Sequence, residues 1–406
     1  MKKTGMFLNI EYGCIFGSYW MIYGIVSSFA AVFLLDRGFS NSQIGITLAV
    51  ANVLAVVMQP LIADFADRSG RIGVIGITEI MTVMMMVFTL GMFIFTGRTL
   101  GLCLVFVLLI AWHTVLQPLF NSLSFRLEES GVMINFGLAR SVGSLAYSLL
   151  VAVLGTLIEK YGVIVMPWTG ELVCLCLLIS LIFTGRHFRK AKAECTDFRA
   201  DAPDVAKSEG EEINLITFAR RNKMFMLVNL GVVGLYFSNS ILNNYMAQIV
   251  DGAGGTTEDM GRILSVMAFL EIPTMVVFNR LKKKFSCTLM LKVAAVGFTV
   301  KIAICRIAES VVLLYVAQLF QLVSFALFLP AMVYFTDQVM SRGEAIKGQA
   351  LFTTMVTVTT IFASLLGGFI LDKAGPEALL SWATAATAAG AVIIIAVIDK
   401  VEKKGR

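Results

Sequence analysis

Long apolar stretches alternate along this sequence with short charged or polar connections. Each stretch holds the roughly 20 residues that a helix needs to cross the hydrocarbon core of a bilayer. The pattern therefore predicts an all-α polytopic membrane protein with twelve transmembrane helices. The predicted spans are residues 8–35, 41–63, 72–96, 99–124, 135–158, 162–185, 224–250, 260–279, 287–308, 310–336, 348–371 and 377–398.

The composition agrees with a protein embedded in lipid. Of the 406 residues, 58% are hydrophobic and 15% are charged, and the mean hydropathy is +0.83. Soluble domains have about 45–50% apolar and about 25% charged residues. The lipid bilayer is thus the expected surrounding. The net charge of +6 follows the topology, so no nucleic acid is expected as a partner.

Basic residues are distributed unevenly between the two sides of the predicted membrane. Most Lys and Arg residues lie in the two ends and the even-numbered loops. Because basic loops mark the cytoplasmic side, both termini are expected to be cytoplasmic, in a plasma or inner membrane. The other side carries only Arg37, Arg98, Lys160, Arg262 and Lys373.

The longest polar stretch, residues 186–223, divides the chain into two halves. It predicts an N-terminal six-helix bundle over 1–185, a cytoplasmic central loop over 186–223 and a C-terminal six-helix bundle over 224–406. His187 lies among basic residues at the start of the stretch and is expected to be a solvated loop histidine.

The two halves carry repeated features. "GTLIEKYG" ends the predicted fifth span at residue 162, and "GFILDKAG" ends the eleventh at residue 375. Pro60 and Pro273 each come shortly before a charged loop at the same offset. Repeats of this kind predict two pseudo-symmetric six-helix bundles and a central site that faces each side of the membrane in turn, which is the architecture of a transporter.

The loop after the second span carries the motif "ADFADRSGR". Its Asp-Arg-x-Gly-Arg core resembles that of the major facilitator superfamily (MFS), and the resemblance covers essentially the whole chain. It implies an MFS fold in which Asp67, Arg68, Gly70 and Arg71 gate the conformational change, since carboxylate–arginine pairs hold one conformation until transport breaks them. Ala63 stands where the family prefers glycine. The alternative is a plain positive-inside loop.

Arg140 lies inside the apolar stretch "FGLARSVGSLAY". A charge within a membrane costs about 2.5–3.5 kcal/mol or more, so it usually has a task. Arg140 and Tyr147 are two helical turns apart on one face. The stretch resembles the fifth helix of the lactose-permease-like branch, which implies that Arg140 binds the substrate and Tyr147 stacks on it. The alternative is an arginine paired structurally with a cytoplasmic loop.

Other positions of that branch are not reproduced. The position of its sugar-binding acid on the fourth helix falls near Ser122, beside Asn121. One acid of its seventh helix is replaced by Asn239, and the arginine of its ninth helix by Lys301. Lactose itself is therefore not expected as the substrate. The predicted substrate-binding residues are Arg140, Tyr147, Asn121, Asn239, Asn243, Lys301, Gln318 and Gln321.

Three buried groups are candidates for proton coupling. Glu271 is the first, because an idle carboxylate within an apolar helix is costly and Lys301 is expected nearby; a purely structural Glu–Lys pair is the alternative. Glu171 is the second. His113 is the third, and it shares a polar stripe with Asn121, although helix–helix hydrogen bonding explains it equally well. Glu11 is expected to snorkel or to pair.

The sequence thus predicts a secondary active transporter, a proton-coupled symporter of a small hydrophilic solute such as a sugar or oligosaccharide. Alternatives are a transporter of nucleosides or of aromatic or organic acids, an exporter, and a non-transporting membrane sensor. An enzyme is not expected, since HExxH, GxSxG and Walker motifs are absent. The scattered cysteines favour no metal site, and no cofactor is expected. The chain is expected to be a monomer.

Overall fold

The computed structural model describes residues 2–68, 73–128, 134–195, 218, 220–340 and 342–405. These residues form helices with short connections, and no strand occurs among them. Helices are expected here, because each backbone polar group in lipid needs a partner within its own segment. The chain divides into two compact units, Met1–Asp204 with Met260–Ser265, and Val205–Asp259 with Val266–Arg406.

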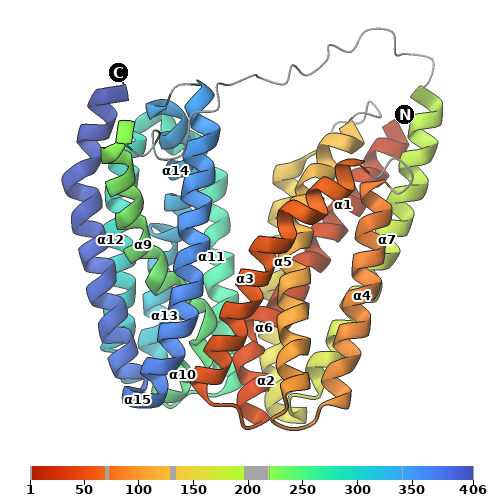
Figure 1. The fold of residues 1–406 in the computed structure, drawn as a ribbon, viewed down its shortest axis with the longest axis horizontal. Coiled ribbons are helices and arrows are strands. Elements are labelled where there is room, and N and C mark those ends of the chain that lie inside the picture. Colours follow the sequence, from red (N-terminus) through yellow and green to blue (C-terminus); the bar gives the residue numbers. More distant parts are fainter. Residues whose placement is uncertain are drawn as a thin grey trace. The chain divides into compact units, whose positions relative to one another are not determined.

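The first unit is drawn in red to yellow-green in Figure 1. Its first span is interrupted by a π-helical turn, and the other spans are unbroken helices. The elements are α1 (Lys2–Tyr23), η1 (Gly24–Ser28), α2 (Ala30–Asp36), α3 (Asn41–Arg68), α4 (Val74–Ile94), α5 (Leu100–Glu128), α6 (Phe136–Tyr161) and α7 (Val165–Cys195).

The second unit is drawn in green to blue in Figure 1. Two of its spans are interrupted, one between α9 and α10 and one by the 3₁₀ turn η2. The elements are α9 (Lys223–Asn244), α10 (Met246–Gly252), α11 (Thr257–Lys284), α12 (Cys287–Arg306), α13 (Val311–Leu319), η2 (Phe320–Leu322), α14 (Phe325–Val339) and α15 (Arg342–Gly405).

Eleven described segments are long and apolar enough to cross a membrane, and the last of them, Glu344–Val401, has 58 residues. Within α15, Gly375 has a non-helical backbone (φ 75°, ψ −178°), and Pro376 follows it. Proline suits the first turn of a helix, so a new helix begins here and α15 is two spans. The predicted twelve-span fold is confirmed.

The internal repeat extends to backbone geometry. Gly162 ends α6 with φ 79° and ψ 174°, close to the angles of Gly375. Residues with a Cβ almost never adopt this region. Both copies of the repeated motif therefore stop a helix by the same backbone turn.

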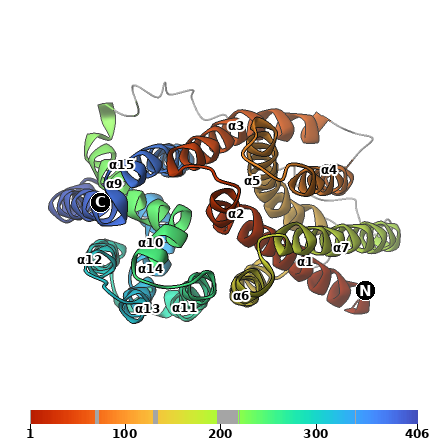
Figure 2. The same ribbon diagram turned by 90° about the horizontal axis from the view of Figure 1, so that it is seen from below.

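Close packing of two helices holds the second unit together. Figure 2, which shows the helices end-on, places α9 next to α15, as does Figure 1. A Cβ at Gly234 of α9 would collide with the carbonyl oxygen of Ala386, and one at Gly390 of α15 would collide with that of Gly231. Small residues let backbones approach where lipid gives no hydrophobic driving force.

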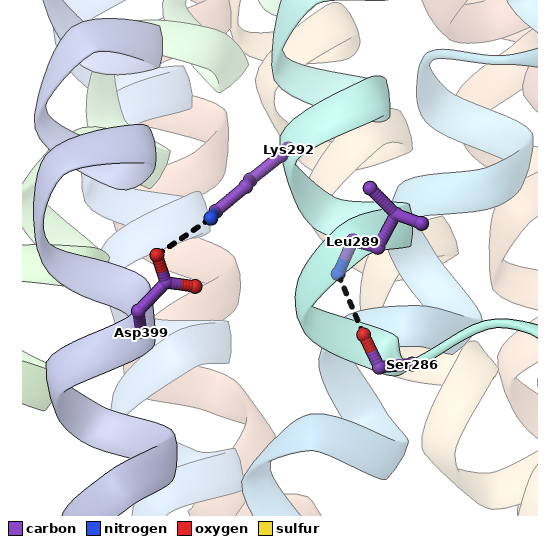
Figure 3. Close-up of polar contacts among 4 residues, drawn as sticks. All are labelled: Ser286, Leu289, Lys292 and Asp399. Atoms are coloured by element: carbon purple, nitrogen blue, oxygen red, sulfur yellow. Dashed lines mark hydrogen bonds and ion pairs between the residues drawn. The ribbon is translucent and has the colours of Figure 1, made fainter.

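A polar pair links α12 to the end of α15. Lys292 Nζ donates to Asp399 Oδ2 at 2.7 Å, and Ser286 Oγ caps α12 by accepting from the Leu289 amide at 3.2 Å (Figure 3). About half of the Asp399 side chain is exposed. Solvent screens such a pair, so it adds little to stability.

Replacing Asp399 by Asn is expected to lower the free energy of unfolding by less than about 1 kcal/mol. Removing the nearby helix cap, with Ser286→Ala, is expected to cost about 1 kcal/mol. Denaturant unfolding of both variants in detergent tests the comparison. A loss of several kcal/mol from Asp399→Asn would show that the pair is a major element of stability.

The last span of the first unit runs past its predicted end at residue 185. Arg, Lys, Ala and Glu residues favour helix, so α7 continues to Cys195. His187 is therefore helical and half-buried; its Nδ1 lies 2.6 Å from Glu11 Oε1, and its ring stacks on Phe7. The expectation of a solvated loop histidine was wrong. Glu11 pairs rather than snorkels.

Candidate functional site

The tenth span is broken in its middle. α13 ends at Leu319, and α14 begins only at Phe325. Between them, the freed carbonyl of Leu322 accepts a hydrogen bond from Thr274 Oγ1 of α11 at 2.9 Å. Irregular backbone at membrane depth needs such partners. The break brings the side chain of Gln321 to face α11 and α12 together.

Gln321 joins two charged groups. Lys301 Nζ of α12 donates to Gln321 Oε1 at 2.6 Å, and Gln321 Nε2 donates to Glu271 Oε1 of α11 at 2.8 Å. Lys301 and Gln321 are 2% and 1% exposed, and Glu271 is half-buried. We call these three residues the Glu271 cluster. Glu271 and Lys301, expected to be neighbours, thus meet through an amide.

The orientation of this amide follows from the charges. An ammonium group only donates hydrogen bonds, so Lys301 must face the amide oxygen. The amide nitrogen then faces Glu271, which must accept, as an ionised carboxylate does. The cluster is therefore neutral as a whole when Glu271 is ionised, and a proton on Glu271 would leave the Lys301 charge uncompensated.

Replacing Lys301 by Met is expected to destabilise the protein by about 3 kcal/mol, because removing one partner of a buried pair leaves the other charge unpaired. Adding Glu271→Gln to this variant should restore most of the lost stability, since no charge then remains in the cluster. Denaturant unfolding in detergent measures both. Equal stability of Lys301→Met and wild type would contradict the charge pairing.

Gln318 is the last residue but one of α13, directly before the break. It is fully buried, and its Nε2 donates to the carbonyl of Leu314 in the same helix at 3.2 Å. Its Oε1 is buried and accepts no hydrogen bond from the residues that the structure describes. Gln318 therefore lies close in sequence to the Glu271 cluster but is not bonded to it.

Arg140 lies over the aromatic ring of Trp20 in the first unit. Its Cζ lies 5.4 Å from the ring centroid of Trp20 in α1, a cation–π distance. The half-buried guanidinium makes no hydrogen bond or ion pair with side chains that the structure describes, and residues 129–133 of the preceding loop lie outside that description. We call Arg140, Trp20, Tyr19, Tyr23, His113 and Tyr147 the Arg140 cluster.

Tyr147 lies next to the π turn of the first span. Its hydroxyl is 2.9 Å from Ser28 Oγ, and its ring centroid is 6.0 Å from that of Tyr23. π-helical turns occur frequently at functional sites. Tyr147 is largely buried, and its hydroxyl is held by the hydrogen bond to Ser28 in the first span.

His113 bonds between helices. Its Nε2 lies 3.0 Å from the carbonyl oxygen of Tyr19, and the two rings stack at 4.1 Å. A carbonyl only accepts, so Nε2 carries the hydrogen. Two turns further along α5, half-buried Asn121 has an Oδ1 that accepts nothing from the described residues. The helix–helix role considered for His113 is present, and its role in coupling remains a proposal.

The other predicted site residues belong to neither cluster. Asn243 Nδ2 donates to the carbonyl of Asn239 at 2.9 Å, so this side chain bonds to its own helix α9. Glu171 lies in α7, half-buried, and its Oε1 is buried without a hydrogen-bond partner among the described residues. No described contact joins Glu171 to the Arg140 cluster.

The predicted gating motif is only partly described. Arg68 Nε pairs with Asp64 Oδ1 at 2.8 Å, one turn back along α3, and both side chains are exposed. Asp67 belongs to α3, whereas Gly70 and Arg71 lie outside the described residues. Within the described part of the chain, no group of three or more His, Cys, Asp or Glu side chains is arranged to hold a metal ion.

The sequence alone did not predict the aromatic partner of Arg140, Trp20. Tyr19, Trp20 and Tyr23 stand together in the first span as "YWMIY". Their number signals an aromatic surface, but nothing in the sequence pairs them with the fifth span. The bridging position of Gln321 was also missed, because it depends on a helix break.

Comparison with known proteins identifies the fold. The model of the MFS_1 like family matches residues 12–381. No curated protein sequence matches the chain significantly. The crystal structure of a mutant of the nucleoside transporter NupG is similar, with a TM-score of 0.76 and 14% identity over 98% of this chain and 100% of that one.

Two further structures share the architecture. A mutant of a peptide transporter, POT, has a TM-score of 0.72 at 12% identity, covering 99% of this chain and 95% of that one. A bacterial homologue of the human lysosomal transporter Spinster, inward-facing and unoccupied, has a TM-score of 0.61 at 13% identity, covering 100% and 98%. At such identities the likeness concerns the fold alone.

Proposed function

This chain belongs to the MFS_1 like family and is a multi-pass membrane transporter of the MFS type, and from that premise we propose that it is a proton-coupled symporter of a small hydrophilic solute. Alternating access of a central site is the mechanism that the internal repeat favours. Both termini are proposed to be cytoplasmic, in a plasma or inner membrane, as the basic loops favour.

The Glu271 cluster carries the proposal for proton coupling. Ionised Glu271 accepts from Gln321, whose other end holds Lys301. A proton on Glu271 removes the charge that balances buried Lys301. A substrate oxygen then competes with Gln321 for the Lys301 ammonium. Proton binding and substrate binding thereby favour one another, which is what symport requires.

The substrate is proposed to be a sugar or oligosaccharide. The Arg140 guanidinium presents a planar fork of donors, which suits vicinal hydroxyls. The rings of Trp20 and Tyr23 provide apolar surface beside that fork. Asn121 and the amides of α9 supply further donors and acceptors for hydroxyl groups. Glu171 and His113 are secondary candidates for the proton.

Nucleosides are the second candidate. The aromatic character of the Arg140 cluster suits a base that stacks, and NupG, which has a similar fold, is a nucleoside transporter. Aromatic and organic acids come next, because an arginine also binds carboxylates in a bidentate way.

Uptake into proteoliposomes tests the proposal. Sucrose, uridine and benzoate serve as sugar, nucleoside and acid probes, with further saccharides added to the panel, and each is measured with and without an inward pH gradient. A saccharide accumulated only with the gradient supports the proposal, and uridine accumulation would select the second candidate. Transport that ignores the gradient would remove proton coupling. Binding without transport of any compound would favour a sensor, and outward movement an exporter.

A further inference from the structure

We propose that Trp20 is a positioning residue that fixes the Arg140 guanidinium for substrate binding. The proposal deepens the function proposed above, in which Arg140 binds the substrate. It stands on the contact of Trp20 with Arg140 and on the absence of a side chain at Gly143.

Three side chains contact the indole ring of Trp20. The Arg140 Cζ lies 5.4 Å from its ring centroid. Tyr19 and Tyr23 contact it in T-shaped arrangements, with centroids 5.4 and 5.5 Å away. These contacts hold the ring in one orientation, because aromatic pairs prefer edge-to-face geometry.

Gly143 makes room for this ring. It lies three residues after Arg140, on the same face of α6. A Cβ at Gly143 would collide with Trp20 Cδ1 and would lie 3.3 Å from the carbonyl oxygen of Phe16. The closest of these contacts is with the indole, so a Cβ at Gly143 would displace the Trp20 ring. Gly143 therefore allows Trp20 to reach Arg140.

The arginine has no other described anchor. Its guanidinium forms no hydrogen bond or ion pair with a side chain that the structure describes. A free arginine side chain samples many rotamers, and holding it in one of them reduces the entropy lost when a ligand binds. The Trp20 ring also attracts the positive charge without neutralising it, which leaves the donors of the fork available.

Modification of Arg140 by phenylglyoxal tests the proposal without a known substrate. The rate at Arg140 is measured by mass spectrometry, with exposed Arg68 as the internal reference. Trp20→Leu and Gly143→Ala should each raise the Arg140 rate by about 3- to 30-fold, the range of a cation–π contact. Trp20→Phe, which keeps a ring, should raise it less. An unchanged rate in Trp20→Leu overturns the proposal.

Trp112 provides a matched control. It is also half-buried in the first unit, and its ring packs on Phe88 at 5.6 Å, with no described contact to Arg140. Trp112→Leu removes a ring of the same size and should leave the rate at Arg140 unchanged. An equal increase in both leucine variants would indicate a general loosening of the unit and would contradict a specific role for Trp20.

A double-mutant cycle connects the result to transport, using whichever saccharide of the panel, uridine or benzoate the wild type takes up. Trp20→Leu should raise KM with little change in kcat, and it should add nothing further in Arg140→Ala. Additive effects overturn the positioning role. If Arg140→Ala leaves KM unchanged while Trp20→Leu still exposes Arg140, the role of Arg140 in the proposed function fails and the positioning role stands.

Discussion

Glu271→Gln is expected to abolish accumulation of the solute against its gradient while preserving exchange. Glutamine keeps the size of the side chain and can still bond to Gln321, but it binds no proton. The transporter then equilibrates solute without drawing on the pH gradient. Uptake driven by a pH gradient, compared with counterflow at equal pH in the same proteoliposomes, measures the two properties separately.

Glu171→Gln is the matched control, because Glu171 is a half-buried glutamate outside both clusters. It should retain gradient-driven accumulation. Full accumulation by Glu271→Gln would refute the role of Glu271 in coupling. Loss of accumulation in Glu171→Gln alone would move the proton site to the first unit.

Arg140→Ala is expected to weaken substrate binding by about 10- to 150-fold, since hydrogen bonds to charged groups contribute about 1.5–3 kcal/mol. Arg140→Lys should recover only part of the affinity, because lysine keeps the charge but loses the planar fork. Equilibrium binding of the transported probe to purified protein measures both changes.

Arg37 offers a matched arginine for this experiment. It too lies over an aromatic ring, that of Phe33, and it donates to the carbonyl of Thr96 at 3.1 Å at the end of α2. Arg37→Ala should leave the affinity unchanged. If Arg140→Ala also leaves it unchanged, substrate recognition belongs to other residues and the comparison with Arg140 in the lactose-permease-like branch does not apply.

The sequence predicted the fold well because lipid imposes a simple rule. Each span needs about 20 apolar residues, so the number and order of the spans can be predicted from the sequence. The ends of the helices are predicted less accurately. α7 runs on to Cys195 because the polar residues after 185 are themselves good helix formers, and polarity alone does not stop a helix.

The candidate site was predicted only in part. That Glu271 and Lys301 lie near one another could be predicted from their opposite charges, since an unpaired charge is costly in lipid. The amide of Gln321 between them could not be predicted, because residues 320–324 read "FQLVS" and contain neither Gly nor Pro, the residues that usually indicate a helix break. Trp20 shows the same limit, because contact between the first and fifth spans depends on packing that periodicity does not encode.

The broken tenth span is also expected to open more easily than an unbroken helix. Residues 320–324 depart from the regular α-helical ladder, since Val323 N donates to Phe320 O at 3.2 Å, a bond over three residues as in a 3₁₀ turn. Regions of this kind exchange their amide hydrogens through small openings, at lower free energy than an intact helix. Deuterium uptake in a peptide covering Gln321 should therefore change when Gln321 releases Glu271 or Lys301. A single peptide could then report the state of the transport cycle in unlabelled protein, with unbroken α12 as its slow internal standard.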